Sequence, residues 1–124
     1  MDDGAPVYTR QSANDLLPEV KVRLHRLQGA SATIAGHRIT TVAASGRNGG
    51  GAGARDWLAA SKIAAEELTW FGEAGIVLRD IAQGLLDFPG QRDGREIYLC
   101  WRQGEAAVDF WHDPGSGFAG RQPL

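Results

Sequence analysis

The stretch of sequence that decides the fold covers residues 95–111 and reads REIYLCWRQGEAAVDFW. Apolar and polar side chains alternate on both sides of Gln103-Gly104, which is the pattern of a β-hairpin closed by a two-residue turn. Because a slip of one residue would move every side chain to the other face, the pattern predicts one register. That register pairs Trp101 with Ala106, Leu99 with Val108 and Ile97 with Phe110 on an apolar face, and Arg102 with Glu105 and Tyr98 with Asp109 on a polar face.

A first amphipathic helix is predicted to begin after Thr9, a residue that suits an N-cap, and to extend to about Ala44. Apolar residues recur in it with the 3.6-residue period of a helix. This stripe comprises Ala13, Leu16, Leu17, Val20, Leu24 and Leu27. A glycine-rich connector over residues 46–53 follows.

A second helix is predicted after the connector, with Asp56 as its N-cap. Gly75 is placed to end this helix in the left-handed conformation, with Ile76 folded back onto Phe71. The apolar stripe of this helix comprises Trp57, Ala60, Ala64, Leu68 and Phe71.

Short strands predicted at residues 76–79, 85–88, 95–102 and 106–111 complete the chain. Two helices followed by antiparallel strands indicate an α+β fold. We therefore predict a single domain over residues 1–124. An antiparallel helical hairpin at about 9–74 packs on a small antiparallel β-meander, and the sheet and a C-terminal arm occupy about 75–124.

The composition is that of a soluble globular domain, with 43% hydrophobic and 23% charged residues. The net charge of -2, without a stripe of basic residues, argues against binding to nucleic acid. No apolar run approaches the roughly 20 residues that cross a bilayer, and the acidic N-terminus does not resemble a secretory signal. We expect a cytoplasmic protein that binds neither nucleic acid nor membranes.

Several phrases resemble the bacterial family known as domain of unknown function 2203. They are YT at 8–9, AN at 13–14, LLPE at 16–19, GLLDFP at 84–89, GREIYLCW at 94–101, WH at 111–112 and GFAGRQPL at 117–124. The resemblance spans nearly the whole chain and departs at residues 29–53, which are rich in Gly, Ala and Thr where the family usually has charged, Leu-rich helices. Since the family has no established activity, the resemblance implies a fold and a location, not a mechanism.

The predicted hairpin brings polar residues to one end of the sheet, where Arg95 falls opposite His112. A histidine beside carboxylates suits proton transfer near neutral pH, and arginines bind carboxylate, sulfate or phosphate groups. The candidate site has His112 as general acid or base, Asp87 or Asp113 to orient it, and Arg95, Arg102, Arg121 and Gln122 to hold an anion. The alternative is an ion-pair network of Arg95, Asp87, His112 and Arg121 that fastens the C-terminal arm.

No cofactor or metal is predicted. His112, Asp113, Asp87 and Glu105 are of ligand type, but His25 and His37 are too far apart along one helix to share an ion. Cys100, the only cysteine, is expected on the outer face of the hairpin as a half-buried thiol without a neighbouring base or metal partner.

Ile63 and Trp70 form a second apolar shoulder about 120° around the second helix from its main stripe. Such a surface is typical of an interface with another chain, unless Trp70 covers its own hairpin partner. Our leading hypothesis is an interaction module or accessory subunit that forms a homo-oligomer or binds a protein partner. The competing hypothesis is a small enzyme or ligand-binding protein that acts on an anionic small molecule by elimination or hydrolysis.

Overall fold

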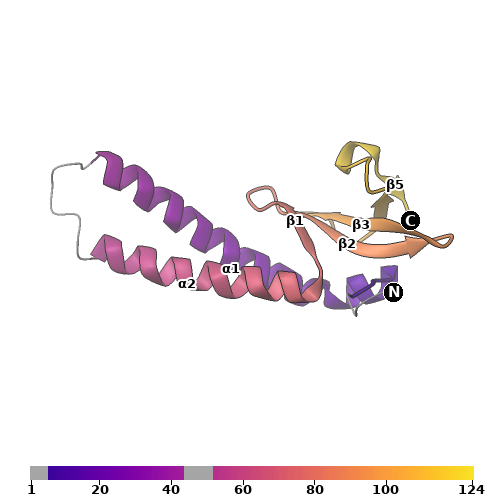
Figure 1. The fold of residues 1–124 in the computed structure, drawn as a ribbon, viewed down its shortest axis with the longest axis horizontal. Helices are drawn as coiled ribbons and strands as arrows, with labels where there is room; N and C mark the ends of the chain where they lie inside the picture. The colour runs from indigo at the N-terminus through magenta and orange to yellow at the C-terminus, as the bar shows by residue number, and fades with distance from the viewer. Residues whose placement is uncertain (1–5, 44–51) are drawn as a thin grey trace.

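The computed structural model describes residues 6–43 and 52–124, and over these residues it confirms the α+β class. Helices α1 (Arg10–Ala43) and α2 (Ala52–Ala74) form a long antiparallel hairpin that extends well past the sheet (Figure 1). The predicted connector at 46–53 lies largely outside the described residues. The strands are β1 (Val77–Asp80), β2 (Leu85–Arg92), β3 (Arg95–Arg102), β4 (Phe110–His112) and β5 (Gln122–Pro123), with a short 3-10 helix η1 (Phe118–Gly120) before β5.

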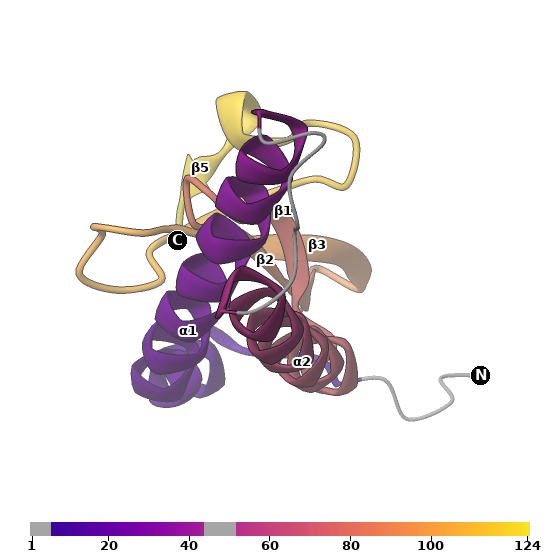
Figure 2. The ribbon, with the colours of Figure 1, turned by 90° about the vertical axis from the view of Figure 1, so that its left-hand side faces the viewer.

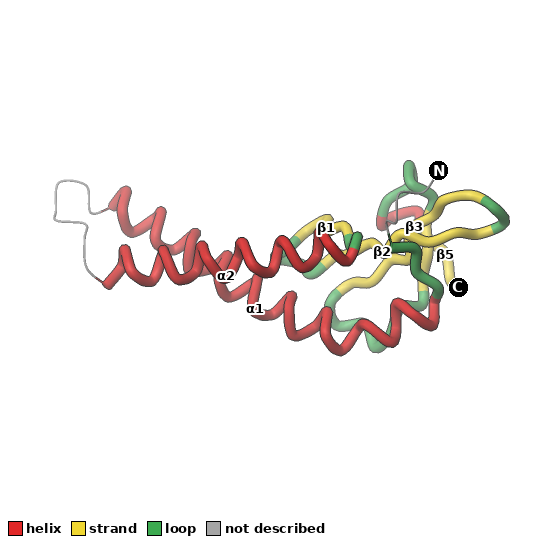
Figure 3. The backbone as a smooth tube through the Cα atoms, turned by 60° about the horizontal axis from the view of Figure 1, so that its bottom comes forward, coloured by secondary structure: helices red, strands yellow, loops and turns green. Residues whose placement is uncertain are grey.

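The five strands form an antiparallel meander in the order β1-β2-β3-β4-β5 (Figure 3). The helices lie on one face of this sheet, and the segment that carries η1 lies over the opposite face before the chain joins the sheet as β5, beside β4 (Figures 1 and 2). We call the face toward the helices the inner face and the other the outer face. Within residues 6–43 and 52–124, neither helix combines the length and the apolar character that a membrane span requires.

The core lies between the first half of α1 and the inner face of the sheet. The predicted α1 stripe is confirmed, since five of its six members are buried and Leu16 is partly buried. Each large apolar side chain that is fully buried here contributes about 1.5–3 kcal/mol. The sheet contributes to this core Leu86, Phe88, Ile97, Leu99, Trp101 and Trp111.

The face that α2 presents to α1 differs from the predicted stripe. Trp57 and Leu68 are exposed, at 36% and 47%. In their place the carboxylate of Glu67 is fully buried and accepts hydrogen bonds from Arg23, at 3.1 Å, and from Arg26. Ala60 and Phe71 of the predicted stripe are buried and Ala64 is partly buried, so the assignment was wrong at Trp57 and Leu68 alone. A buried acid paired with two arginines of the neighbouring helix cannot be recognised from an apolar period.

The ends of the helices follow the sequence with one exception. At the start of α1, Thr9 Oγ1 accepts a hydrogen bond from the Ser12 backbone N–H at 3.0 Å, as expected of an N-cap. Gly75 has φ 73°, and the Ile76 N–H donates to the Phe71 carbonyl at 3.0 Å, as predicted for the end of α2. The cap assigned to Asp56 is wrong, because α2 begins four residues earlier at Ala52.

The predicted register of the last hairpin is also wrong. Strand β4 begins only at Phe110, which pairs with Cys100, so Phe110 lies on the outer face and not opposite Ile97. The reason is a contact with α1: the Asn14 side chain accepts a hydrogen bond from the Val108 N–H at 2.7 Å and donates to the Val108 carbonyl at 3.1 Å. These bonds satisfy the backbone that the predicted hairpin would have paired with β3.

Candidate functional site

Four consecutive strands each place one polar side chain at a cleft on the outer face of the sheet. These residues are Arg79 on β1, Asp87 on β2, Cys100 on β3 and His112 on β4. The cleft has a volume of about 300 Å³, and the loop that leads from β4 to η1 forms its other wall. We call these four side chains the outer-face cluster.

Strand pairing explains how the cluster is assembled. Asp87 faces Cys100 directly across the β2–β3 ladder, so their side chains are neighbours on one face. His112 pairs with Tyr98, two residues along β3 from Cys100, and therefore lies on the same face. Val77 pairs with Asp87, so Arg79, two residues further along β1, lies on the same face of the sheet and donates a hydrogen bond to Asp87.

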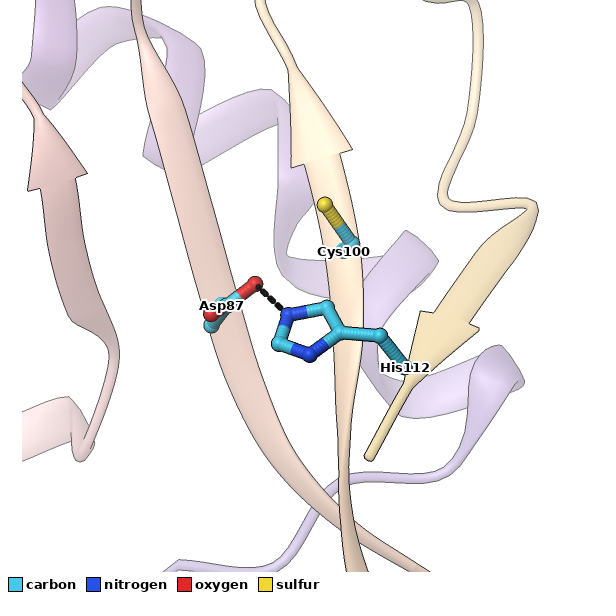
Figure 4. Close-up of side chains that lie close together, drawn as sticks. All are labelled: Asp87, Cys100 and His112. Atoms are coloured by element: carbon cyan, nitrogen blue, oxygen red, sulfur yellow. Dashed lines mark hydrogen bonds and ion pairs between the residues drawn. The ribbon is translucent and has the colours of Figure 1, made fainter. Parts of the chain in front are cut away.

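The centre of the cluster is a hydrogen-bonded pair of buried titratable groups. His112 Nε2 lies 2.9 Å from Asp87 Oδ1, and both residues are 2% exposed. Figure 4 shows the imidazole ring reaching from β4 across β3 toward the Asp87 carboxylate, with Cys100 beside it. The other carboxylate oxygen, Oδ2, accepts a hydrogen bond from Arg79 Nε at 2.8 Å.

The second ring nitrogen of His112 fixes how the pair holds its protons. Nδ1 lies 2.7 Å from the backbone carbonyl oxygen of Asp113, which can only accept, so Nδ1 carries a proton and donates it. Nε2 therefore faces Asp87, and one further proton is shared between this nitrogen and the carboxylate. Because Nδ1 donates to a backbone carbonyl, Nε2 is the ring nitrogen that interacts with the cluster.

Cys100 is 1% exposed, and one ligand atom from each of Asp87, Cys100 and His112 lies within 4.8 Å of the others. Burial, followed by the negative charge of Asp87, raises the pKa of the thiol to about 11. Both ring nitrogens of His112 are engaged by oxygen atoms, so His112 is not positioned to deprotonate Cys100. The thiol is therefore no activated nucleophile, but it is more buried than the sequence predicted and has two potential co-ligands beside it.

The arginines predicted to hold an anion do not line this cleft. Arg95 is 57% exposed and pairs with Asp113 at 2.9 Å, so it does not face His112. Arg121 binds both oxygens of Glu105, at 3.0 and 2.5 Å, and thereby fastens the C-terminal arm. Arg102 is exposed, with its guanidinium 5.7 Å from the ring of Phe118, and Gln122 is exposed on β5.

The two residues of the apolar shoulder predicted on α2 lie in different environments. Trp70 is partly buried, contacts Phe71 edge-on and lies under the guanidinium of Arg23 from α1, 4.9 Å from its ring. Ile63 is also partly buried and lines a shallow groove between the two helices. The large apolar side chains that are exposed on α2 are instead Trp57, Leu58 and Leu68.

Arg79 and Cys100 are the members of the cluster that sequence reasoning missed. A signal for Cys100 was present in Asp93-Gly94, a dipeptide typical of two-residue hairpin turns, and both residues have positive φ, 53° and 78°. A turn at that point places Asp87 opposite Cys100. Arg79 shares the face of Asp87 because Val77, two residues before it, pairs with Asp87.

The model of a family described as Uncharacterized conserved protein (DUF2203) matches residues 6–124, nearly the whole chain. The chain belongs to this family. The resemblance noted in the sequence is thereby confirmed, and all four members of the outer-face cluster lie within the matched residues of DUF2203. No curated protein and no solved structure matches the chain.

Proposed function

We propose that the outer-face cleft binds a small anionic ligand and that His112 and Asp87 exchange a proton with it. The observation that carries this proposal is the buried, hydrogen-bonded His112–Asp87 pair, which lines a cleft of about 300 Å³. Paired titratable groups at the wall of a cleft are typical of acid–base sites. Hydrolysis and elimination are the reaction classes that need such a pair together with stabilisation of a leaving anion.

The charge of the cleft supports an anionic ligand. Arg79 counts +1, and the His112–Asp87 pair with its shared proton counts 0, so the three groups together carry +1. The hydrogen bond from Arg79 to Asp87 uses Nε, and the side chain lines the cleft and is 41% exposed, so a ligand in the cleft can reach the guanidinium. Carboxylate, sulfate and phosphate groups match a guanidinium in shape and charge.

Thermal unfolding with sulfate, phosphate and small carboxylates, in the presence of a chelator, tests this proposal. An anion at 100 times its dissociation constant stabilises the folded state by about 2.7 kcal/mol. We expect Arg79→Gln to abolish the stabilisation. Arg92→Gln is a matched control, because both residues are strand arginines above an aromatic ring. Arg79 lies 5.0 Å from the ring of Tyr98, and Arg92 lies 4.6 Å from the ring of Trp111 but outside the cleft. No stabilisation by any anion, or an equal loss in both variants, would contradict the proposal.

A second candidate function, an interaction module or accessory subunit, is favoured by a different surface. A groove of about 630 Å³ lies between α1 and the loop after β3, and Val22, which is 62% exposed, lines it. Leu58 on α2 is 60% exposed. Light scattering after size exclusion tests this function. We expect a dimer or a co-purifying partner that Val22→Glu or Leu58→Glu dissociates, and a protein that stays monomeric without a partner would contradict it.

A further inference from the structure

We propose that Asp87, Cys100 and His112 form a mononuclear centre for a divalent transition metal such as Zn²⁺, with an open coordination position toward the cleft. The inference rests on the proposed function, because it concerns the same anion-binding cleft, and it assigns proton exchange there to a metal-bound water in place of His112. It rests on the geometry of three buried side chains from β2, β3 and β4.

The donor set matches this class of metal. A thiolate, an imidazole nitrogen and a carboxylate oxygen are ligands that Zn²⁺ accepts together, whereas Mg²⁺ and Ca²⁺ prefer oxygen alone. The three donor atoms lie within 4.8 Å of one another. Ligands of a tetrahedral zinc ion stand about 3.3–3.8 Å apart, given bonds of about 2.0–2.3 Å, so adjustments of about 1 Å bring the three atoms onto one ion.

The surroundings of the three residues are those of metal ligands. Nδ1 of His112 donates to the Asp113 carbonyl at 2.7 Å, which orients Nε2 toward the centre in the way that ligating histidines are usually held. Arg79 holds the second oxygen of Asp87 and leaves Oδ1 directed at the centre. Outer partners of this kind fix both the tautomer and the ring orientation of a ligand.

Metal binding leaves the charge of the cleft unchanged. A divalent ion displaces two protons, one from the Cys100 thiol and one shared by His112 and Asp87. The centre is then neutral, counting +2 for the metal and -1 each for thiolate and carboxylate, and Arg79 still adds +1. Three protein ligands leave a fourth position for water or for an anion, as is usual in catalytic zinc sites. His112 then acts as a ligand, and a metal-bound water takes over proton exchange.

The test is titration of chelator-treated protein with Co²⁺, because a thiolate bound to cobalt gives an intense charge-transfer absorption. The chain has one cysteine, so this band reports Cys100 alone. We expect saturation at one equivalent, displacement by Zn²⁺, and loss of the band with at least a tenfold weaker affinity in Cys100→Ser. Asp109→Asn is the control, because this exposed acid pairs with Arg10 outside the cleft, and it should bind like the wild type.

Absence of the band in the wild-type protein would overturn the inference, and so would an affinity that Cys100→Ser leaves unchanged, which would indicate adventitious surface binding. The first result does not depend on the folding of a variant, because it uses the unaltered chain. Repeating the phosphate titration with and without Zn²⁺ separates the two proposals. Anion binding without metal binding refutes the metal centre alone, and metal binding without anion binding refutes the proposed anion site alone.

Discussion

The ring of His112 is held from both sides, with Nδ1 2.7 Å from the Asp113 carbonyl oxygen and Nε2 2.9 Å from Asp87 Oδ1. Because a carbonyl oxygen only accepts, we predict that Nδ1 is protonated wherever the shared proton of the pair resides. Long-range ¹H–¹⁵N correlation spectra of the metal-free protein should show this nitrogen bonded to hydrogen. A neutral ring protonated only at Nε2 would contradict the arrangement.

Cys100 should react slowly with thiol reagents while the protein is folded. Burial and the charge of Asp87 raise the pKa of its thiol from 9.0 to about 11, so the thiolate fraction near pH 8 falls on the order of 100-fold. We expect Ellman's reagent to label the chelator-treated protein at the rate of unfolding and the urea-unfolded protein at once. Rapid labelling without denaturant would show that the cleft exposes the sulfur.

Among the residues between the two helices, we expect substitution of Glu67 to lower the unfolding free energy most. Glu67→Gln keeps the shape of the side chain but removes the charge that Arg23 and Arg26 neutralise, and we expect a loss of about 2–3 kcal/mol in unfolding free energy. Urea unfolding followed by circular dichroism measures it. Glu66→Gln, at the exposed neighbouring position, should change stability by less than about 0.5 kcal/mol. Equal effects would mean that the buried pairs contribute nothing specific.

Two glycines should respond to alanine with opposite signs. Gly75 has φ 73°, and an added Cβ would meet Pro6 Cδ at 3.1 Å, so Gly75→Ala should destabilise by about 1 kcal/mol or more. Gly29 lies inside α1 with no atom within 4 Å of an added Cβ, and Gly29→Ala should stabilise by about 0.5–1 kcal/mol. Thermal unfolding of both variants measures the two changes in stability. A Gly75→Ala protein that is more stable than the wild type would contradict a strained backbone at this position.

The C-terminal arm should loosen in acid. Burial alone would raise the pKa of Glu105, but hydrogen bonds from Arg121 and the Arg102 backbone outweigh it, and the pKa lies below its ordinary value of 4.5. The stability that this ion pair adds is therefore complete above pH 4.5 and is lost as the pH falls through the lower, folded-state pKa.

Hydrogen exchange of the Leu124 amide, which donates to the Asp109 carbonyl at 2.8 Å, reports on the arm. In the wild type, the protection of this amide should fall as the pH is lowered below 4.5. In Glu105→Gln, the protection should be lower than in the wild type and should not change with pH over the same interval. An unchanged acid dependence in Glu105→Gln would assign the effect to another group.

The elements that the sequence predicted are those set by nearby residues. The stripe that runs from Ala13 to Leu27 follows from helical periodicity, and the end of α2 follows from a glycine that can adopt positive φ. The predicted hairpin register was wrong because the observed register depends on a contact between distant segments. The Asn14 side chain captures the Val108 backbone 94 residues away, and no alternation within residues 95–111 encodes that bond.

The candidate site was predicted in part for the same reason. His112 and Asp87 are 2.9 Å apart, although the register that motivated their association was wrong. His112 pairs with Tyr98 and not with Arg95, and it reaches Asp87 across β3 on the outer face. Arg95 does not belong to the site, because the observed pairing of β3 with β4 differs from the predicted one by three residues. Arg79 was overlooked because its place beside Asp87 follows from the pairing of Val77 with Asp87, and that pairing was not predicted.

The meander draws Arg79, Asp87, Cys100 and His112 from four successive strands, one residue each. Since neighbours along a strand point to opposite faces, sliding β2 by a single position would replace the Asp87 carboxylate with Leu86 or Phe88. No half-formed sheet can assemble the cluster. A ligand held there would lock β1 through β4 as a unit, and slowed exchange should then spread to amides in all four strands at once.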